Sequence, residues 1–252
     1  MIMQAERMTV KCSDYYDGLL SIPRETVLCV DTETTGLDPK KDEILQVGIV
    51  DGNCNVVLNT YIRPDHRRRW PKAQEMSGIS WSTVKDAPEM WEVRNEIERT
   101  IADAKLVVGY NVGFDVSMLE EAGINIDESK TYDVMEDCSR VWGKWSDKKG
   151  GYLWMKLAEA ARRFGVELDA HDAVNDATAT MKIFYTMLSR WEFVEAERRS
   201  DELRESSIRL KQEAAEVERK KEIGGSVRVL TAFVVAIASI LLLFYGCSSI
   251  FA

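Results

Sequence analysis

The chain has 252 residues, 45% of them hydrophobic and 30% charged, a composition typical of a globular protein with one sizeable domain and appendages. Its 33 basic residues face 42 acidic ones, and the net charge of −9 argues against a protein that coats duplex nucleic acid through bulk charge. Five cysteines without a CxxC pair argue against a zinc site or a disulfide framework and favour a reducing compartment, and the first residues lack the apolar core of a secretory signal.

Apolar runs near the start of the chain predict three β-strands. They cover residues 26–32, 44–50 and 55–62, and short turns such as DGN at 51–53 separate them. Strands joined by such short turns favour an antiparallel meander. A fourth, shorter strand is expected at 105–110.

Helical periodicity fills much of the remaining sequence up to residue 190. We predict helices at 88–104, at 116–123 with Gly123 as its end, at 153–165 with Gly165 as its end, and from about Ala173 onward. The apolar stripe of the last helix consists of Ala177, Met181, Phe184 and Leu188, and such a stripe favours core packing over a cofactor surface. Residues 1–190 are therefore expected to form one α/β domain.

The segment that follows is rich in charge and has neither Gly nor Pro over residues 191–222. Alternating charge signs predict a solvated helix. Leu203, Leu210 and Val217 are seven residues apart, but the intervening heptad positions are not apolar, so a stable coiled coil is not expected. We predict a charged helical stalk over 191–225, with a weak homodimer through its helix as the alternative.

The last part of the chain is apolar, and residues 229–252 contain no charge. A membrane span needs about 20 apolar residues, which this run supplies. A buried core helix is the alternative, but a polar stalk precedes the run and leaves no domain to bury it. We therefore expect a C-terminal transmembrane anchor over 226–252.

The flanking charges of this run predict its orientation. The basic residues that precede it are Arg219, Lys220, Lys221 and Arg228, and no charged residue follows. By the positive-inside rule, the N-terminal domain is expected in the cytoplasm.

Two carboxylates end the first predicted strand, in the stretch VDTETTGL at 30–37. Side chains alternate along a strand, so Asp31 and Glu33 are expected on one face and Thr32 on the other. Two neighbouring like charges cost energy unless a cation lies between them, and a divalent cation is the usual solution. A solvated strand end leading into a Thr-Gly turn is the alternative.

Two further acidic positions lie downstream. Asp115 follows a short predicted strand at the start of a helix, and Asp176 lies in the first turn of the last helix, five residues after His171. Taken singly, Asp115 is typical of a first-turn acid and His171 of a surface loop. Taken in order, these positions form the series D-x-E, N-x-x-F-D and H-x-x-x-x-D.

This series resembles the DEDDh 3′-to-5′ exonucleases, the family of the proofreading epsilon subunit of bacterial DNA polymerase III. The resemblance runs from about Thr26 to Leu188 and includes ILQVGIV, YIRP, the Gly-Ile of SGIS and the DAP at 86–88. It implies a ribonuclease H-like fold, a mixed sheet flanked by helices. The chain has Ser77 and Tyr110 where many members have His. Neither position is a metal ligand, so these departures do not affect the expected catalysis. They do make the substrate preference of the family less transferable to this chain.

The chemistry of such a family explains the residue types. Phosphodiester hydrolysis needs a nucleophile at neutral pH and neutralisation of charge on the attacking and leaving oxygens, and two Mg²⁺ or Mn²⁺ ions supply both. Hard cations take oxygen ligands, so four carboxylates suit such a site. The resemblance implies that Asp31 bridges both ions, that Glu33 and Asp176 hold the nucleophile-side ion, and that Asp115 holds the other. His171 is suited to take the proton from the attacking water.

The resemblance also implies contacts with the terminal nucleotide. They map to Thr34, Thr35, Gly36, Leu37, Asn111 and Phe114. Leu37 and Phe114 would wedge and stack against a terminal base, with core packing as an equal alternative for Phe114. The basic run HRRRW at 66–70, with Lys72, is a candidate for holding phosphates, but a solvated loop is the favoured interpretation.

Two functions fit these patterns. The first is a membrane-anchored 3′–5′ exonuclease that releases nucleoside 5′-monophosphates from 3′ ends of single-stranded DNA or short RNA. The second is a catalytically inactive nucleic-acid-binding or scaffold module on a membrane tether. The intact set of four carboxylates and one histidine favours the first, and the sequence does not distinguish DNA from RNA.

Overall fold

The protein is described by a computed structural model that covers residues 15–142, 144–146, 148–190, 206, 208–216 and 219. The chain divides into two units, 1–198 and 199–252. The described residues of the second unit are helical, and Arg209 and Glu213 form an ion pair at 3.5 Å one turn apart. Leu203, Val217 and the apolar segment lie outside the described residues, so the stalk dimer and the membrane anchor stay predictions. Within the described ranges, no helix has the length and apolar character that crossing a membrane requires.

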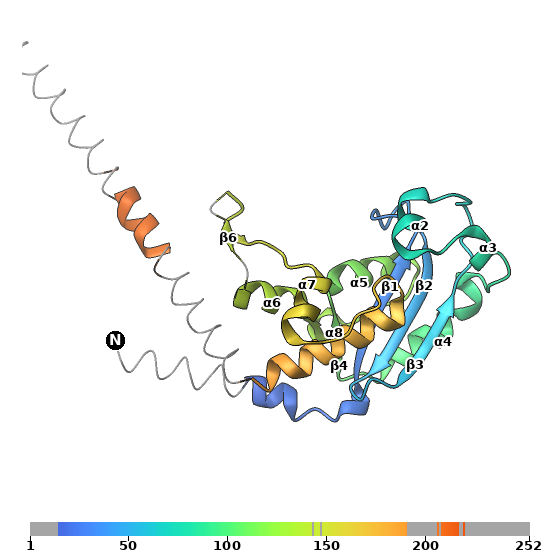
Figure 1. The fold of residues 1–252 in the computed structure, drawn as a ribbon, viewed down its shortest axis with the longest axis horizontal. Helices are drawn as coiled ribbons and strands as arrows, with labels where there is room; N and C mark the ends of the chain where they lie inside the picture. The colour runs from blue at the N-terminus through green and yellow to red at the C-terminus, as the bar shows by residue number, and fades with distance from the viewer. Residues whose placement is uncertain are drawn as a thin grey trace, which may run out of the picture. The chain divides into compact units, whose positions relative to one another are not determined.

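A mixed five-stranded sheet forms the centre of the first unit (Figure 1), with the strand order β3-β2-β1-β4-β5. The first three strands pair antiparallel, whereas β1 pairs with β4 and β4 with β5 in parallel. The strands are β1 (Val27–Thr34), β2 (Ile44–Asp51), β3 (Val56–Tyr61), β4 (Leu106–Gly109) and β5 (Thr131–Asp133). The predicted meander and fourth strand are confirmed. Sequence patterns missed β5 because its three residues contain no apolar run.

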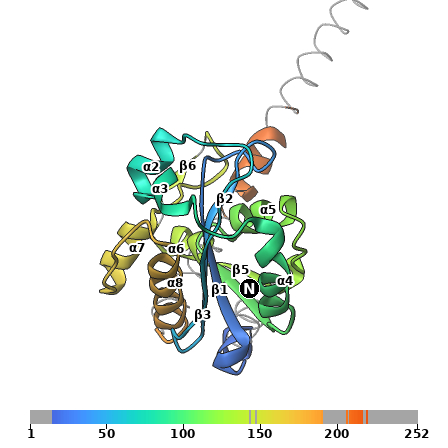
Figure 2. The ribbon, with the colours of Figure 1, turned by 90° about the vertical axis from the view of Figure 1, so that its right-hand side faces the viewer.

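Helices cover both faces of this sheet, as Figure 2 shows with the sheet between them. On one face β1 packs against α8 through Val27 and Cys29, and on the other it packs against the α4–α5 layer through Leu28 and Val30. The helices are α2 (Pro71–Ser77), α3 (Trp81–Val84), α4 (Met90–Ala102), α5 (Val112–Glu121), α6 (Val134–Trp142), α7 (Leu157–Phe164) and α8 (Ala173–Leu188). This arrangement confirms the predicted ribonuclease H-like α/β fold, and the apolar stripe of α8 is buried as expected.

The helix predicted at 153–165 begins only at Leu157, so the first part of that prediction was wrong. Hydrogen bonds to distant parts of the chain hold the preceding residues in an extended path. The Leu153 amide donates to the Lys144 carbonyl at 2.9 Å, and the Tyr110 hydroxyl donates to the Met155 carbonyl at 2.8 Å. These residues instead continue a short hairpin of β6 (Trp145–Ser146) and β7 (Gly151–Tyr152). Tertiary contacts here override the local helical pattern.

Candidate active site

The two carboxylates of β1 lie on the strand face that α8 covers. Val27 and Cys29 have the same parity along the strand as Asp31 and Glu33, and they pack in the α8 core. Ligand atoms of Glu33, His171 and Asp176 all lie within 4.8 Å of one another. The fold therefore brings the end of β1 beside the start of α8, although Glu33 and Asp176 are 143 residues apart in the sequence.

Asp115 reaches the same strand from the opposite layer. It lies in the first turn of α5, and only 4% of its surface is exposed. Its Oδ1 accepts hydrogen bonds from the Thr32 amide at 2.9 Å and from the Thr32 hydroxyl at 2.7 Å. Thr32 points away from Asp31 and Glu33, as predicted, but sequence reasoning missed that this orientation lets it hold Asp115. The only signal was a hydroxyl residue between the two acids.

Burial and mutual repulsion raise the pKa values of these carboxyl groups. The pKa of Asp31 lies well above its usual range because of burial and the nearby Asp115, Asp176 and Glu33. Burial, followed by Asp176, raises the pKa of Glu33 to about 7. Burial also raises the pKa of Asp115 to about 7, although the hydrogen bonds from Thr32 oppose the shift.

This donor set fits a divalent cation. The charged neighbours that raise the pKa values of Asp31 and Glu33 are themselves carboxylates, so they increase the repulsion that ionisation creates. The Oδ1 atom of Asp176 is buried and has no hydrogen-bond partner within the described residues. Buried anionic oxygens of this kind are stabilised by a bound cation, and hard cations with oxygen ligands match the chemistry of the group.

His171 lies at the exposed edge of this cluster. Its backbone amide donates to Asp176 Oδ2 at 3.2 Å, and its φ of 73° places it in the left-handed region. That conformation is uncommon for a residue other than glycine and is found where the surrounding structure enforces it. The loop therefore turns the imidazole toward Glu33 and Asp176 while leaving it accessible to solvent.

Comparison with known proteins identifies the family. The model of the exonuclease family named RNase_T matches residues 28–184, which include all four carboxylates and His171. The chain belongs to this exonuclease family.

Individual members of the exonuclease family share the same region. A PolC-type DNA polymerase III of Staphylococcus saprophyticus is 30% identical over 174 residues, which cover 66% of this chain and 12% of that protein. A 3′-5′ exonuclease DinG of Staphylococcus haemolyticus is 32% identical over 171 residues, which cover 65% of this chain and 18% of that protein. The chain thus spans less than a fifth of the length of these relatives.

Solved structures agree on the exonuclease fold. Apo exonuclease I superposes with a TM-score of 0.55 at 19% identity, covering 69% of this chain and 44% of that one. E. coli exonuclease I in complex with a dT13 oligonucleotide gives a TM-score of 0.54 at 20% identity, covering 65% and 41%. At this identity the likeness shows a shared fold.

Two residues of β2 allow the start of α8 to pack closely against that strand: Gln46, through its side-chain amide, and Gly48, through its lack of a side chain. Gln46, only 1% exposed, donates to Asp172 Oδ2 and to Asn59 Oδ1, both at 3.0 Å. Asp172 is the N-cap of α8 and accepts from the first backbone amides of the helix. A Cβ atom on Gly48 would lie 2.5 Å from the Ala173 carbonyl carbon. The residues Gln46 and Gly48 of β2, which the sequence patterns assigned only to a strand, therefore fix the position of the first turn of α8, which carries Asp176.

The close approach at Gly48 gives a testable prediction. Gly48→Ala is expected to push the first turn of α8 away from β2, because the new methyl group would meet backbone atoms that cannot rotate aside. We expect about 1–3 kcal/mol of lost stability, the usual cost of overpacking, and weaker Mn²⁺ binding. Urea unfolding and Mn²⁺ titration measure the two effects. Gly113→Ala, where a Cβ meets nothing within 4 Å, is the matched control, and equal behaviour of both variants would contradict the prediction.

The nucleotide contacts predicted at the end of β1 and in the loop that follows it differ in their surroundings. The Thr34 hydroxyl donates to the Gly36 carbonyl at 2.6 Å, and the Thr35 hydroxyl donates to Asp42 at 3.2 Å, so both are used within the loop. Leu37, in contrast, is 84% exposed.

The contacts predicted in the second motif lie at the start of α5. Asn111 occupies the N-cap position of α5 with a φ of 66°, and its backbone N–H donates to Asp133 Oδ1 at 3.0 Å. Phe114 is partly buried against the α4–α5 core, which agrees with the core-packing alternative.

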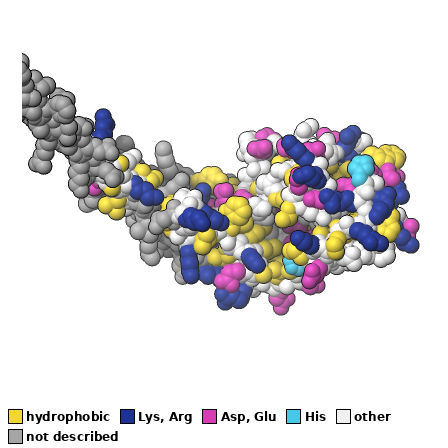
Figure 3. All heavy atoms as spheres, turned by 90° about the horizontal axis from the view of Figure 1, so that it is seen from above, with side chains coloured by type: hydrophobic (Ala, Val, Ile, Leu, Met, Phe, Trp, Pro, Cys, Tyr) yellow, Lys and Arg dark blue, Asp and Glu magenta, His cyan; other side chains and the backbone are white. Residues whose placement is uncertain are grey.

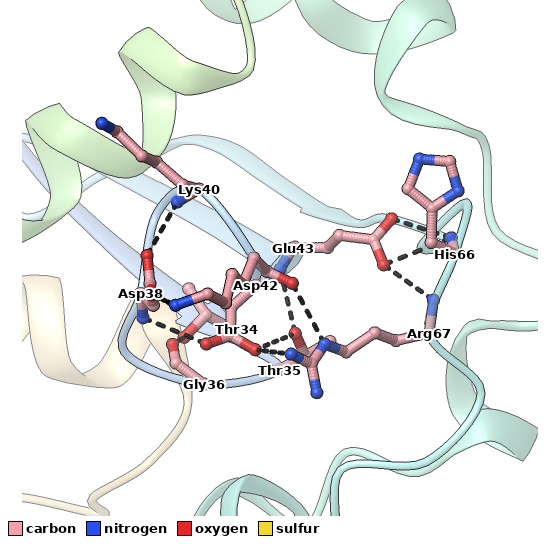
Figure 4. A network of polar contacts seen from close by, with 10 residues as sticks. Thr34, Thr35, Gly36, Asp38, Lys40, Asp42, Glu43, His66 and Arg67 are labelled. Atoms are coloured by element: carbon pink, nitrogen blue, oxygen red, sulfur yellow. Dashed lines mark hydrogen bonds and ion pairs between the residues drawn. The ribbon is translucent and has the colours of Figure 1, made fainter.

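The basic run at 66–70 is tied to the same β1–β2 loop, as Figure 4 shows. Glu43 accepts from the backbone amides of Asp65, His66 and Arg67, and Arg67 also pairs with Asp42 at 2.9 Å. Arg68 lies over the Trp81 ring at 4.4 Å and donates to nearby carbonyls. The run forms a largely exposed loop, as the favoured interpretation predicted, but two of its three arginines, Arg67 and Arg68, bind the protein itself.

The raised pKa values predict how stability depends on pH. Glu33 and Asp115 have pKa values of about 7 in the folded protein, against ordinary values of 4.5 and 3.8. Between these limits the folded state holds more protons than the unfolded state, so their contribution to the free energy of unfolding is lost as pH rises from about 4 to 7. We expect metal-free protein to lose stability over this window and added Mn²⁺ to restore it, because the cation favours the ionised carboxylates.

Urea unfolding at several pH values, with EDTA or with Mn²⁺, measures this dependence. Glu33→Gln cannot ionise and is expected to show a flatter pH dependence without metal than the unsubstituted protein. Identical pH profiles for the two proteins in EDTA would show that the burial of Glu33 does not control stability.

Proposed function

We propose that this chain is a membrane-tethered, metal-dependent 3′–5′ exonuclease that removes nucleoside 5′-monophosphates from 3′ ends of single-stranded DNA or short RNA. The observation that carries the proposal is the convergence of Asp31, Glu33, Asp115 and Asp176 from both layers of the sheet, beside His171. Such a cluster destabilises the protein in the absence of a cation. Its retention within an exonuclease domain is explained by catalysis.

The four carboxylates would hold Mg²⁺ or Mn²⁺ ions. When bound, such ions make water a nucleophile at neutral pH and stabilise charge on the attacking and leaving oxygens. Among the ligands, Asp115 is fixed by Thr32, and Asp176 by the packing of α8 on β2. The ligand positions are therefore preorganised by both layers of the fold.

His171 supplies the base. In the proposed step, the imidazole takes a proton from the attacking water as the water oxygen bonds to phosphorus. The bond from phosphorus to the 3′ oxygen of the penultimate nucleotide breaks, that oxygen takes up a proton from water to become the new 3′ hydroxyl, and the terminal nucleotide leaves as a 5′-monophosphate. An exposed imidazole can then return its proton to solvent, which suits repeated turnover.

Single-stranded substrates suit the surroundings of the site. Leu37 is exposed at the loop that follows β1, where it would stack against a terminal base of any identity. An exonuclease I of related fold binds a dT13 oligonucleotide, which supports DNA as one substrate.

A 3′-labelled oligonucleotide tests the activity. Full-length protein with Mg²⁺ is expected to release labelled mononucleotide from single-stranded DNA or RNA, and a 5′ label is expected to give a ladder shortened from the 3′ end. Parallel DNA and RNA substrates reveal the sugar preference. Binding without any hydrolysis at millimolar Mg²⁺ or Mn²⁺ would instead support the inactive binding or scaffold module.

The proposed anchor and the cytoplasmic placement rest on the apolar residues 229–252 and on the basic residues before them. Cell fractionation tests both. We expect the full-length chain to stay in the membrane during an alkaline carbonate wash, and a chain ending at Glu222 to be released yet remain active. Digestion of the nuclease domain by protease outside intact cells would contradict the orientation.

A further inference from the structure

A hollow of about 520 Å³ lies beside the N-terminus of α7, and it combines basic and aromatic side chains. Its lining includes Lys144, Leu153, Trp154 and Lys156. We call this surface the Trp154 hollow. Trp154 is 72% exposed, an unusual position for the largest apolar side chain.

The backbone beneath Trp154 is fixed. Its neighbour Met155 is buried, the Met155 amide donates to Ser139 Oγ at 3.1 Å, and its carbonyl accepts from the Tyr110 hydroxyl at 2.8 Å. An exposed indole on a fixed backbone loses little entropy when a planar group stacks on it.

The hydrogen bond from the Tyr110 hydroxyl to the Met155 carbonyl connects the hollow to an element of the active site. Tyr110 directly precedes Asn111, the N-cap of α5, and α5 carries Asp115 in its first turn. The β6–β7 hairpin that leads into the hollow projects from the same side of the domain as α2 in Figure 1. The loop before α2 is in turn bonded through Glu43 to the loop that follows β1. The Trp154 hollow therefore belongs to the end of the sheet that bears the carboxylates.

The charge around the hollow differs from that of the chain. Residues 144–156 contain four lysines and one aspartate, although the whole chain has a net charge of −9. Lys144 and Lys156 are exposed and have no ion-pair partner within the part of the chain that the structure describes. The arginines of the run at 66–70, in contrast, are largely engaged by the protein. Figure 3 views the domain from the side on which α2 and the β6–β7 hairpin lie in Figure 1, and it shows basic, acidic and hydrophobic side chains intermixed.

We propose that the Trp154 hollow binds single-stranded nucleic acid upstream of the 3′ nucleotide that occupies the active site, with a base stacked on Trp154 and phosphates at Lys144 and Lys156. This inference rests on the proposed exonuclease function and adds the path of the substrate strand. Stacking on an indole is independent of base identity, and ammonium groups neutralise phosphates, so the surface suits strands of any sequence. It extends binding beyond the terminal nucleotide and favours longer strands over dinucleotides.

Two probes separate this role from catalysis. One is a 5′-fluorescein oligothymidylate of 16 nucleotides, and the other is the p-nitrophenyl ester of thymidine 5′-monophosphate, which has no upstream nucleotides. For Trp154→Ala in the full-length chain, we expect KM for the 16-mer to rise about 5- to 150-fold, the usual effect of losing one stacked base. Hydrolysis of the ester is expected to be unchanged.

The lysines are tested through salt dependence. Lys144→Gln/Lys156→Gln is expected to raise KM for the 16-mer and to reduce the slope of log KM against log salt by about 1.4, since each phosphate contact with a single strand contributes about 0.7. Matched controls are Trp91→Ala, whose indole is 69% exposed on α4, and Lys105→Gln, at the opposite end of β4 from the site. Both controls are expected to behave like the unsubstituted protein.

Three outcomes would overturn the inference. They are an unchanged KM for the 16-mer in both variants, an equal loss on the 16-mer and on the ester, and an equal effect of the control substitutions. If the unsubstituted protein hydrolyses neither probe, the proposed function fails, and anisotropy of the labelled 16-mer still decides the inference. Weaker binding by the Trp154 and lysine variants alone would then support it, and equal binding would overturn it.

Discussion

Asp31→Asn is expected to lower kcat by more than about 10³-fold and, at the same time, to stabilise the metal-free protein. The loss of activity follows because Asp31 lies near Asp115, Asp176 and Glu33 and is the expected shared metal ligand. Removing its charge removes several kcal/mol of metal-dependent transition-state stabilisation, at 1.36 kcal/mol for each factor of ten in rate. The gain in stability follows because an amide cannot repel Asp115, Asp176 and Glu33. Relief of about 1 kcal/mol corresponds to roughly 2–4 °C in Tm for a domain of this size.

The two halves of this prediction need separate measurements. Steady-state hydrolysis of an oligonucleotide at millimolar Mg²⁺ gives kcat, and thermal unfolding in EDTA at pH 8 gives Tm. Asp103→Asn is the control, because Asp103 is exposed at the C-terminal end of α4. Near-normal turnover by Asp31→Asn would refute its assignment as a metal ligand. A Tm that falls while the Asp103 variant is unchanged would refute the proposed repulsion.

Sequence patterns were sufficient for most of the sheet because its strands are apolar and joined by short turns. The run 44–50 forms β2, all eight residues of which are buried, and the stripe of α8 is core as predicted. The period of two along β1 was also sufficient to place Asp31 and Glu33 on one face. These features depend only on local periodicity, which a sequence carries directly.

Contacts between distant segments were not accessible in the same way. The clamp of Thr32 on Asp115 spans 83 residues, and the bond from Gln46 to Asp172 spans 126. Neither contact can be recognised from the local sequence, because a threonine or a glutamine within a strand does not indicate which distant residue it will bind. The helical pattern from Leu153 was misleading for the same reason, because Tyr110 and Ser139 hold Met155 in an extended conformation.

Replacement of His171 is expected to lower kcat by about 10²- to 10⁴-fold, the usual contribution of a general base. The choice of substitute matters because His171 has a φ of 73°. Asparagine and glycine tolerate this conformation, whereas alanine adds backbone strain. His171→Asn therefore tests the loss of the imidazole with least disturbance of the loop, and His171→Ala is expected to show the same loss together with lower stability.

The pH profile separates a base from a merely structural residue. In the unsubstituted protein the rate is expected to rise as the imidazole loses its proton, and this rise should disappear in His171→Asn, while Mn²⁺ binding survives because the four carboxylates remain. His171→Gly leaves a space beside Glu33 and Asp176, so imidazole added to the solution is expected to restore part of the rate. His66→Asn is the matched control, since His66 is the only other histidine of the chain and is exposed. A pH profile that persists unchanged in His171→Asn would assign the base to another group, and loss of Mn²⁺ binding would show that His171 acts through the metal site instead.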